Sequence, residues 1–266
     1  MRRLFVIVLW GLIVFPQFVV GQILSTTFFK VTPGDSFYVA FFADGNIRGI
    51  ASTSNDKQAI GTGALGINVQ RGNVSWSAVV NVASSIDTLK NCFGAHLLNP
   101  TTGKSLAGYL DIRINSFCEL FGNKFGLHSY LGTSKSNWIF RDEMFNAVTS
   151  GFGLMLYNDI INAELNENEI SFGIELGLAL RWIAGDIADD SNESHREKLV
   201  GTTTKHFPGF EGGMQIQFGS IIAGIQGYWL FDLAKSDFVP GLSRGQISAG
   251  FSISGPIFQG YFKKKK

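Results

Sequence analysis

The segment 170–182, ISFGIELGLALRW, alternates between two kinds of side chain with a period of two. Its even-numbered positions are all large and apolar, whereas its odd-numbered positions are small or, at Glu175 and Arg181, charged. Successive side chains of a β-strand point to opposite faces, so the segment predicts a strand with one apolar and one polar face. A strand with this length and contrast needs an apolar phase on one side and water on the other.

The same alternation recurs along the chain. It is clear in five more segments, which are 58–71, 73–83, 105–117, 209–218 and 246–254. It is weaker in four others, which are 36–44, 124–133, 146–157 and 221–232. The pattern therefore predicts ten strands, and most are near the roughly 9–11 residues with which a tilted strand crosses a bilayer.

The predicted connections largely alternate between short and long. The segments 72–73 and 219–220 are two-residue links, whereas 84–104 and 184–208 are long loops. The remaining predicted links are 45–57, 118–123, 134–145, 158–168 and 233–244. An even number of antiparallel strands with short turns at one end and long loops at the other is typical of outer-membrane barrels. We predict an all-β, antiparallel, up-and-down transmembrane β-barrel of about ten strands, within a range of roughly eight to twelve.

The N-terminus predicts export. Arg2 and Arg3 precede an apolar run that ends at Val20-Gly21, so residues 1–21 are expected to be a cleaved signal peptide. No later stretch has the 18 or so consecutive apolar residues of a spanning helix, so the exported chain is expected to be soluble or to span as a closed sheet. Residues 22–35 would form a periplasmic or plug segment, 36–262 the barrel, and 263–266 a basic tail.

Composition agrees with a barrel without proving one. Charged residues make up 16% of the chain, against about 25% in an average soluble domain. Glycine accounts for 32 of 266 residues, more than the average of about 7%. The formal net charge of +1 does not suggest nucleic-acid binding.

From Phe37 to Phe262 the chain resembles a Gram-negative outer-membrane β-barrel protein of the Bacteroidota type. The resemblance implies a bacterial outer-membrane location, contact with membrane lipid and lipopolysaccharide, and recognition of the last strand by the barrel-assembly machinery. That machinery reads a terminal aromatic residue, a place that Tyr261-Phe262 would fill. Pro256 inside the strand and the four lysines after Phe262 depart from the pattern.

The inward-facing charged side chains of such a barrel would form a polar lumen network, because an isolated buried charge is costly. The predicted members are Asp111, Arg113, Lys124, His128, Glu175, Arg181, Glu211 and Asp232. The network would either neutralise itself and hold the barrel together or form a narrow polar pathway. Aromatic residues near the strand ends would form girdles at the two interfaces; these are Phe37, Trp76, Phe172, Trp182, Phe210, Phe218, Trp229 and Phe231.

The two cysteines, Cys92 and Cys118, are expected to be free thiols. The topology places them at opposite ends of the barrel, about 25 Å apart, whereas a disulfide needs Cα atoms within about 7 Å.

Enzyme chemistry is not expected. His128 and Ser129 are neighbours on a strand and point to opposite faces, so they cannot form a catalytic dyad. We find no metal-ligand spacing among the histidines and cysteines, and the acidic run 186–193 lacks the pattern of an EF-hand loop, so it reads as a solvated loop. We predict neither a metal nor another cofactor.

Three functions remain open. The leading hypothesis is an outer-membrane barrel that acts as a narrow pore or as a scaffold whose loops 84–104 and 184–208 bind a surface ligand. The alternatives are an outer-membrane lipid or peptide hydrolase that uses His128 or His206, and a soluble secreted β-barrel that binds a small apolar ligand. The soluble alternative requires the large apolar faces to point inward.

Overall fold

The computed structural model describes residues 36–51, 57–83, 98, 106–140, 143–165, 168–234 and 244–263. It contains one antiparallel sheet, and each of the ten predicted segments corresponds to one of its strands, although 221–232 extends past the end of β9. The strands are β1 (Ser36–Ala51), β2 (Lys57–Arg71), β3 (Val74–Ala83), β4 (Leu106–Leu120), β5 (Asn123–Phe140), β6 (Glu143–Leu165), β7 (Asn168–Gly185), β8 (His206–Phe218), β9 (Ile221–Leu230) and β10 (Gly245–Lys263). The predicted all-β, antiparallel fold class is therefore confirmed.

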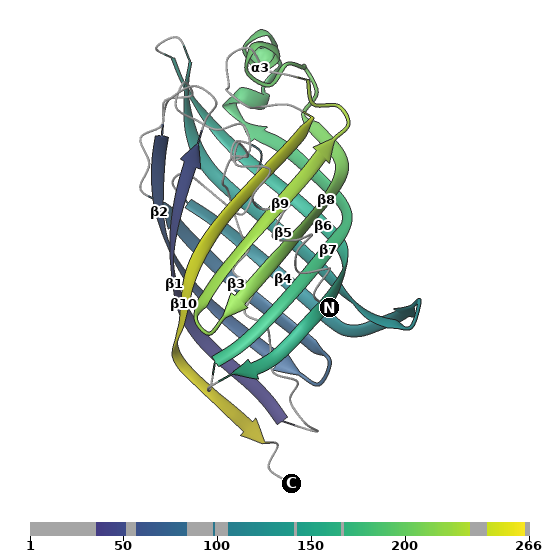
Figure 1. Ribbon diagram of the computed structural model, residues 1–266. Coiled ribbons are helices and arrows are strands. Elements are labelled where there is room, and N and C mark those ends of the chain that lie inside the picture. The colour runs from purple at the N-terminus through teal and green to yellow at the C-terminus, as the bar shows by residue number, and fades with distance from the viewer. Residues whose placement is uncertain are drawn as a thin grey trace.

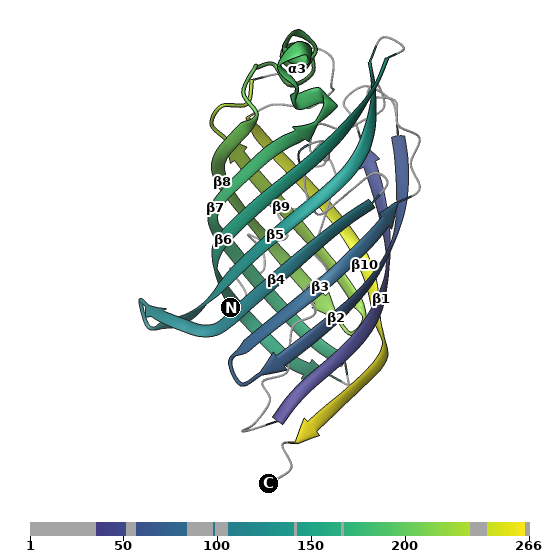
Figure 2. The same ribbon diagram turned by 180° about the vertical axis from the view of Figure 1, so that it is seen from behind.

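The strands pair in chain order, and the first pairs with the last, which closes the sheet into a barrel (Figures 1 and 2). Phe37 of β1 lies opposite Arg71 of β2 on one side and opposite Phe262 of β10 on the other. Ser36 pairs with Lys263. Both ends of the barrel sequence therefore lie beside the short turn at 72–73, and β10 extends one residue beyond the predicted boundary at Phe262.

Four predicted connections are shorter than expected, because the strands on either side continue past their alternating segments. The link between β4 and β5 is 121–122, that between β5 and β6 is 141–142, and that between β6 and β7 is 166–167. The link between β1 and β2 is 52–56. Backbone pairing continues through residues whose polarity no longer alternates along the chain, so periodicity alone could not locate these strand ends. The short turns 72–73 and 219–220 are where they were predicted.

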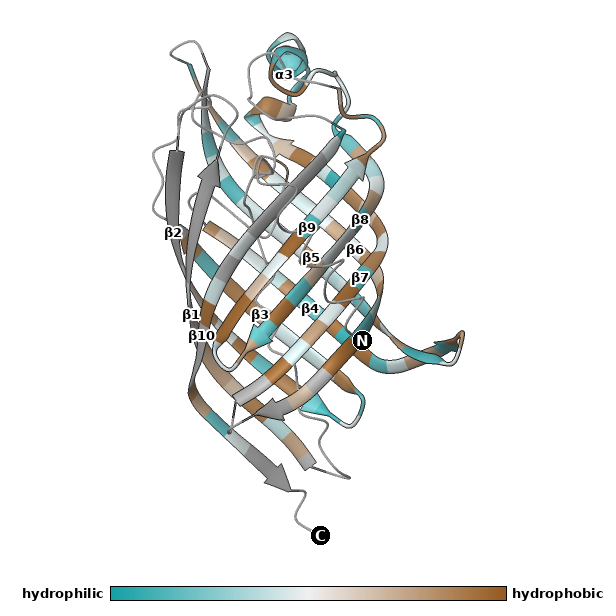
Figure 3. Cartoon of the chain, viewed as in Figure 1, coloured by the Kyte–Doolittle hydropathy of each residue, from teal (hydrophilic) through white to brown (hydrophobic). Residues whose placement is uncertain are grey.

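The two faces of the barrel wall differ as the alternation predicted. In β7, Leu176 is 68% exposed and Leu178 is 58% exposed, whereas Arg181 is 0% exposed. Apolar and polar residues alternate along the strands (Figure 3). The outward face carries large apolar side chains from most strands, among them Leu65, Val80, Leu110, Leu131, Phe152, Ile216 and Ile253. The chain thus places its apolar face outside and its polar face inside.

Two irregularities interrupt the wall. Phe41 pairs with Phe258 and Phe42 with Pro256, so one residue of β10 is bulged next to the proline. Proline lacks an N–H, and a bulge is one of the places where a sheet tolerates it. In β4 the register shifts between Ile114 and Cys118, and the hairpin beyond leaves the barrel sideways (Figure 2).

A structured cap covers the long-loop end between β7 and β8. It consists of two 3-10 turns, Asp186–Ala188 and Asp190–Asn192, followed by α3 (Glu193–Val200). Ile187, Leu199 and Val200 are fully buried in one cluster with Trp138, Phe145 and Phe207 of the barrel. The acidic side chains of 186–193 are exposed, as expected of a solvated segment, but the run is ordered in two 3-10 turns and Ile187 is buried against the rim, so it is not a plain loop.

Arg196 of α3 holds the cap together. Its guanidinium donates hydrogen bonds to the carbonyl oxygens of Thr203 (2.9 Å), Ile187 (3.1 Å) and Asp189 (3.2 Å). The side chain is buried, so these carbonyls satisfy a donor that water cannot reach. The long-loop end of the barrel thus has an ordered lid over its apolar rim.

Candidate functional site in the barrel lumen

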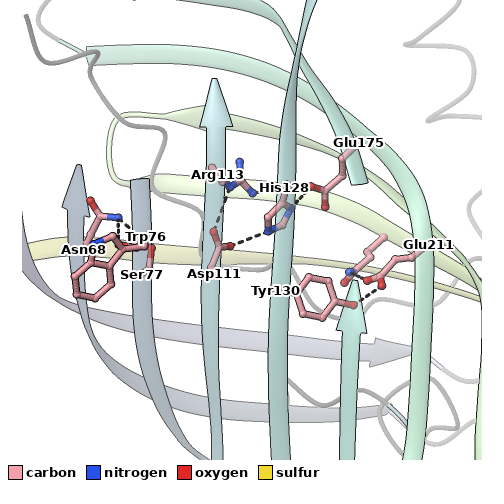
Figure 4. Close-up of polar contacts among 10 residues, drawn as sticks. Asn68, Trp76, Ser77, Asp111, Arg113, His128, Tyr130, Glu175 and Glu211 are labelled. Carbon is pink, nitrogen blue, oxygen red and sulfur yellow. Dashed lines mark hydrogen bonds and ion pairs between the residues drawn. The ribbon is translucent and has the colours of Figure 1, made fainter. Parts of the chain in front are cut away.

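A charged quartet lies inside the barrel where β4, β5 and β7 face one another (Figure 4). His128 Nε2 is 2.8 Å from Asp111 Oδ2, and His128 Nδ1 is 2.9 Å from Glu175 Oε2. Arg113 completes the group, with its Nε 3.7 Å from Asp111 Oδ1 and its Nη2 3.9 Å from Glu175 Oε2. His128, Asp111 and Arg113 are buried.

The contacts of the two ring nitrogens of His128 indicate that its imidazole is protonated. A neutral imidazole has one N–H, whereas both nitrogens of an imidazolium donate, and an ionised carboxylate only accepts. Because both ring nitrogens of His128 are within hydrogen-bonding distance of carboxylate oxygens, an imidazolium satisfies all of these groups. The quartet then holds two positive and two negative charges and is neutral, as burial requires.

A second cluster surrounds Glu211 of β8. Arg181 Nη2 lies 2.6 Å from Glu211 Oε2, and both side chains are buried. The hydroxyl of Tyr130 and the side-chain amide of Gln226 also donate to the Glu211 carboxylate. The Arg181 guanidinium stacks over the ring of Tyr130 at 5.4 Å and over that of Tyr228 at 5.9 Å. Each charge in this pair is therefore compensated, and the carboxylate oxygens have further donors.

Tyr130 connects the two clusters. Its hydroxyl donates a hydrogen bond to Glu211, and its ring centroid lies 5.9 Å from that of His128, with the planes tilted by 45°. Its ring occupies the space over Gly153 of β6, where an added Cβ would lie 2.2 Å from Cε1. The ring of Tyr157 covers Gly126 in the same way. Inward glycines thus make room for tyrosines from the next strand.

Apolar side chains fill another part of the lumen. One buried cluster consists of Phe42, Ala64, Val79, Tyr109, Tyr130 and Met155, which come from β1 to β6. A barrel of about eight strands has an interior that side chains can fill. Ten strands enclose somewhat more space, and the tyrosines and paired charges occupy it.

Six of the eight predicted network residues meet in these two clusters, and two do not. Lys124 is exposed, because it pairs with Glu119 on the hairpin that leaves the wall. Asp232 is also exposed, because β9 ends at Leu230 and Asp232 falls in the following turn. Assigning these two to the lumen was wrong, since inward-facing parity applies only while a strand stays in the barrel.

The prediction missed Tyr130, Tyr157, Gln226 and Tyr228. Tyr130 has the same parity as His128, and Gln226 and Tyr228 have that of Asp232, so alternation could have placed these three in the lumen. No residue of 146–157 was predicted to face inward, so nothing fixed the side on which Tyr157 lies. The predicted network was limited to charged residues and histidine, so it left these tyrosines and this glutamine out.

Seven of the eight predicted girdle residues lie on strands, whereas Phe231 lies in the turn after β9, and five of the eight are well exposed. These are Trp76, Phe210, Phe218, Trp229 and Phe231. Phe37, Phe172 and Trp182 are partly exposed. The rings of Phe210 and Phe231 meet edge to face at 5.4 Å.

Other predicted sites have separate outcomes. Cys118 is a free thiol, as predicted, whereas Cys92 lies outside the described residues, as do 1–35, 264–266 and all of the loop 84–104 except Leu98.

Within the described part of the chain, no group of three or more His, Cys, Asp or Glu residues is arranged to hold a metal ion. The described helices include none that is both long and apolar enough to cross a membrane.

Comparison with known proteins adds no family assignment. No family model matches the chain, and no curated protein matches it.

Proposed function

We propose that this protein is an outer-membrane β-barrel whose lumen is closed by its own side chains, and that it acts as a membrane-anchored scaffold for its capped, long-loop end. The observation that carries the proposal is the inverted distribution of polarity in the wall. Leu176 and Leu178 face outward, whereas Arg181 and Glu211 form an ion pair inside. Large exposed apolar surfaces mark membrane or protein contacts, and a closed barrel leaves no unpaired strand edge in lipid.

The scaffold is favoured over the narrow pore, the other half of the leading hypothesis, by the contents of the lumen. His128, Arg181, Glu211 and Tyr130 are each less than 3% exposed. A water-filled pathway would leave its charged lining in contact with solvent, whereas these side chains are buried and held in ion pairs and hydrogen bonds inside the barrel. The cap adds an apolar layer over the rim through Ile187 and Leu199.

The hydrolase alternative receives little support from the histidines. Both ring nitrogens of His128 face carboxylates, so this side chain has no free lone pair with which to act as a general base. His206 is exposed at the start of β8, opposite Trp182. The soluble alternative needs the large apolar face inside, which is the reverse of the arrangement of Leu176 and Arg181.

The surface that the scaffold would offer includes the cap. Exposed charges of the cap include Asp189, Asp190, Glu193, Glu197 and Lys198. We propose this surface, within the predicted loop 184–208, as the contact for an external ligand. Lipopolysaccharide beside the wall and the barrel-assembly machinery during biogenesis remain the expected partners.

Two measurements test the proposal together. The protein is expected to partition into detergent, and its unboiled form should migrate differently from its boiled form on a gel, as a folded barrel does. In planar bilayers it should give no discrete conductance steps. Conductance steps would replace the scaffold with a pore, and a protein that stays soluble without detergent would refute both.

A further inference from the structure

A hairpin arm, residues 115–125, leaves the barrel wall at the short-turn end. The register changes after the pair Ile114–Leu127, and pairing resumes at Cys118–Phe125, so three residues of β4 oppose one residue of β5. At this elbow Ser116 has a left-handed backbone with φ 56°, a conformation that residues other than Gly, Asn and Asp adopt rarely. The bulge turns the arm outward, away from the lumen (Figures 1 and 2).

The base of the arm is held by specific hydrogen bonds. The Asn115 N–H donates to the carbonyl of Asn73 at 2.7 Å, and the Asn115 side-chain oxygen accepts from the hydroxyl of Tyr157. On the other strand, Asn158 Nδ2 donates to the carbonyl of Lys124 at 2.7 Å. The direction of the arm is therefore set by contacts from the turn 72–73 and from β6 as well as by its own backbone.

The tip of the arm is unusual. Phe121 and Gly122 form the turn with φ of 53° and 75°. Two-residue turns with positive φ at both positions strongly favour Asn-Gly or Asp-Gly, yet the first position here is an aromatic residue. Phe121 is also 99% exposed. A bulky side chain that is fully exposed on a strained backbone indicates function rather than stability.

The two faces of the arm differ in polarity. Cys118, Leu120 and Phe125 share one face with Asn123, which pairs with Leu120 beside the tip, whereas Glu119 and Lys124 pair on the other face. Leu120, beside the tip, is exposed, and so is Phe117, at the elbow. A two-stranded hairpin is marginally stable when it stands alone in water, so an amphipathic arm of this kind gains from lying on an apolar surface.

We infer that the arm is a membrane-interface anchor, which lies along the bilayer surface at the short-turn side and inserts Phe121 between lipid headgroups. The inference rests on the proposed function. Its occupant is lipid because the arm continues the apolar outer wall: Leu110 and Ile112, exposed on the same strand, precede the elbow. Aromatic residues favour the interface, and the long stem of Lys124 allows its charge to remain in water while the opposite face contacts lipid.

Site-directed spin labelling tests the anchor. Single cysteines replace Phe121, Glu119, Leu176 and Ser194 in turn, in a background carrying Cys92→Ser and Cys118→Ser. Each labelled protein is reconstituted into vesicles of phosphatidylethanolamine and phosphatidylglycerol, and collisions with oxygen and with a soluble nickel chelate are compared. The oxygen-to-nickel ratio is expected to be severalfold higher at 121 than at 119, and to lie between that of Ser194 in the cap and that of Leu176 in the wall.

A second variant keeps an aromatic side chain at position 121. Phe121→Trp should add fluorescence that brominated acyl chains quench, beyond the quenching of the wild-type tryptophans. If the label at position 176 is exposed to lipid while the label at position 121 is exposed to water, the anchor is refuted but the proposed outer-membrane barrel is not. If 121 is shielded from both reagents, the arm contacts protein instead, which also overturns the inference. An aqueous reading at 176 refutes the proposed function itself.

Discussion

Arg181 and Glu211 are 30 residues apart in the chain and meet inside the barrel, with Nη2 and Oε2 separated by 2.6 Å. They belong to adjacent strands but are not direct register partners, since Arg181 pairs with Phe207 and Glu211 with Gly177. The contact therefore requires the length of the arginine side chain to reach diagonally along the lumen. Tyr130 of β5, the strand beyond β6, also donates a hydrogen bond to Glu211.

Replacing Arg181 with Met should destabilise the barrel strongly. The variant keeps an apolar stem but leaves the Glu211 charge buried without its ion partner, and breaking a buried pair from one side costs about 3–5 kcal/mol. Unfolding by urea in lipid vesicles measures the loss. Lys198→Met, which removes an exposed charge from the cap, serves as the control and should change little. Equal stability of the two variants would contradict the described lumen pair.

His128→Gln should also destabilise the protein, because it removes one positive charge from a neutral buried quartet and leaves two carboxylates against Arg113 alone. Adding Glu175→Gln restores neutrality, so the double variant should lose less stability than His128→Gln does. A double-mutant cycle in the same unfolding assay gives the coupling between the two residues. Additive losses would mean that His128 does not carry a charge that Glu175 balances.

Gly153→Ala should disturb the lumen although it adds only one methyl group. The new Cβ would be placed 2.2 Å from Tyr130 Cε1, so the ring must move and its hydrogen bond to Glu211 is weakened. Overpacking of this kind costs about 1–3 kcal/mol. Gly63→Ala is the matched control, since nothing lies within 4 Å of its added Cβ. The expected difference in unfolding midpoint would vanish if Tyr130 pointed elsewhere.

The cap supplies a pH prediction. Lys205 Nζ donates a hydrogen bond to Asp190 Oδ1 at 2.8 Å, and this bond together with the lysine charge lowers the Asp190 pKa below its ordinary value of 3.8. A lowered folded-state pKa means that the contribution to stability is present above pH 3.8 and is lost as the pH falls through the folded value. Lys205→Met should return the Asp190 pKa toward 3.8, as followed by NMR of the carboxyl carbon. Lys205→Arg should keep it low. An unchanged pKa in Lys205→Met would show that the pair does not form.

Much of the wall could be read from the chain because alternation is local. The period-two pattern of 170–182 established which side of β7 is apolar, and the same logic located all ten strands and two of the short turns. Parity likewise placed Asp111, Arg113, His128, Glu175, Arg181 and Glu211 on the inward face. None of these inferences requires knowledge of which strand lies beside which, since each depends on neighbouring residues alone.

Only the tertiary structure decided which inward groups meet, where strands end and which segment leaves the wall. Pairing His128 with both Asp111 and Glu175 depends on register across the four strands β4 to β7 and on the curvature that closing the barrel imposes, and both are non-local. The elbow at Ser116 moved Lys124 out of the lumen, and burial of Ile187 and Leu199 against the rim turned an acidic stretch into a cap. Alternation specifies the face on which a side chain lies, whereas its partners are determined by strands far away in the sequence.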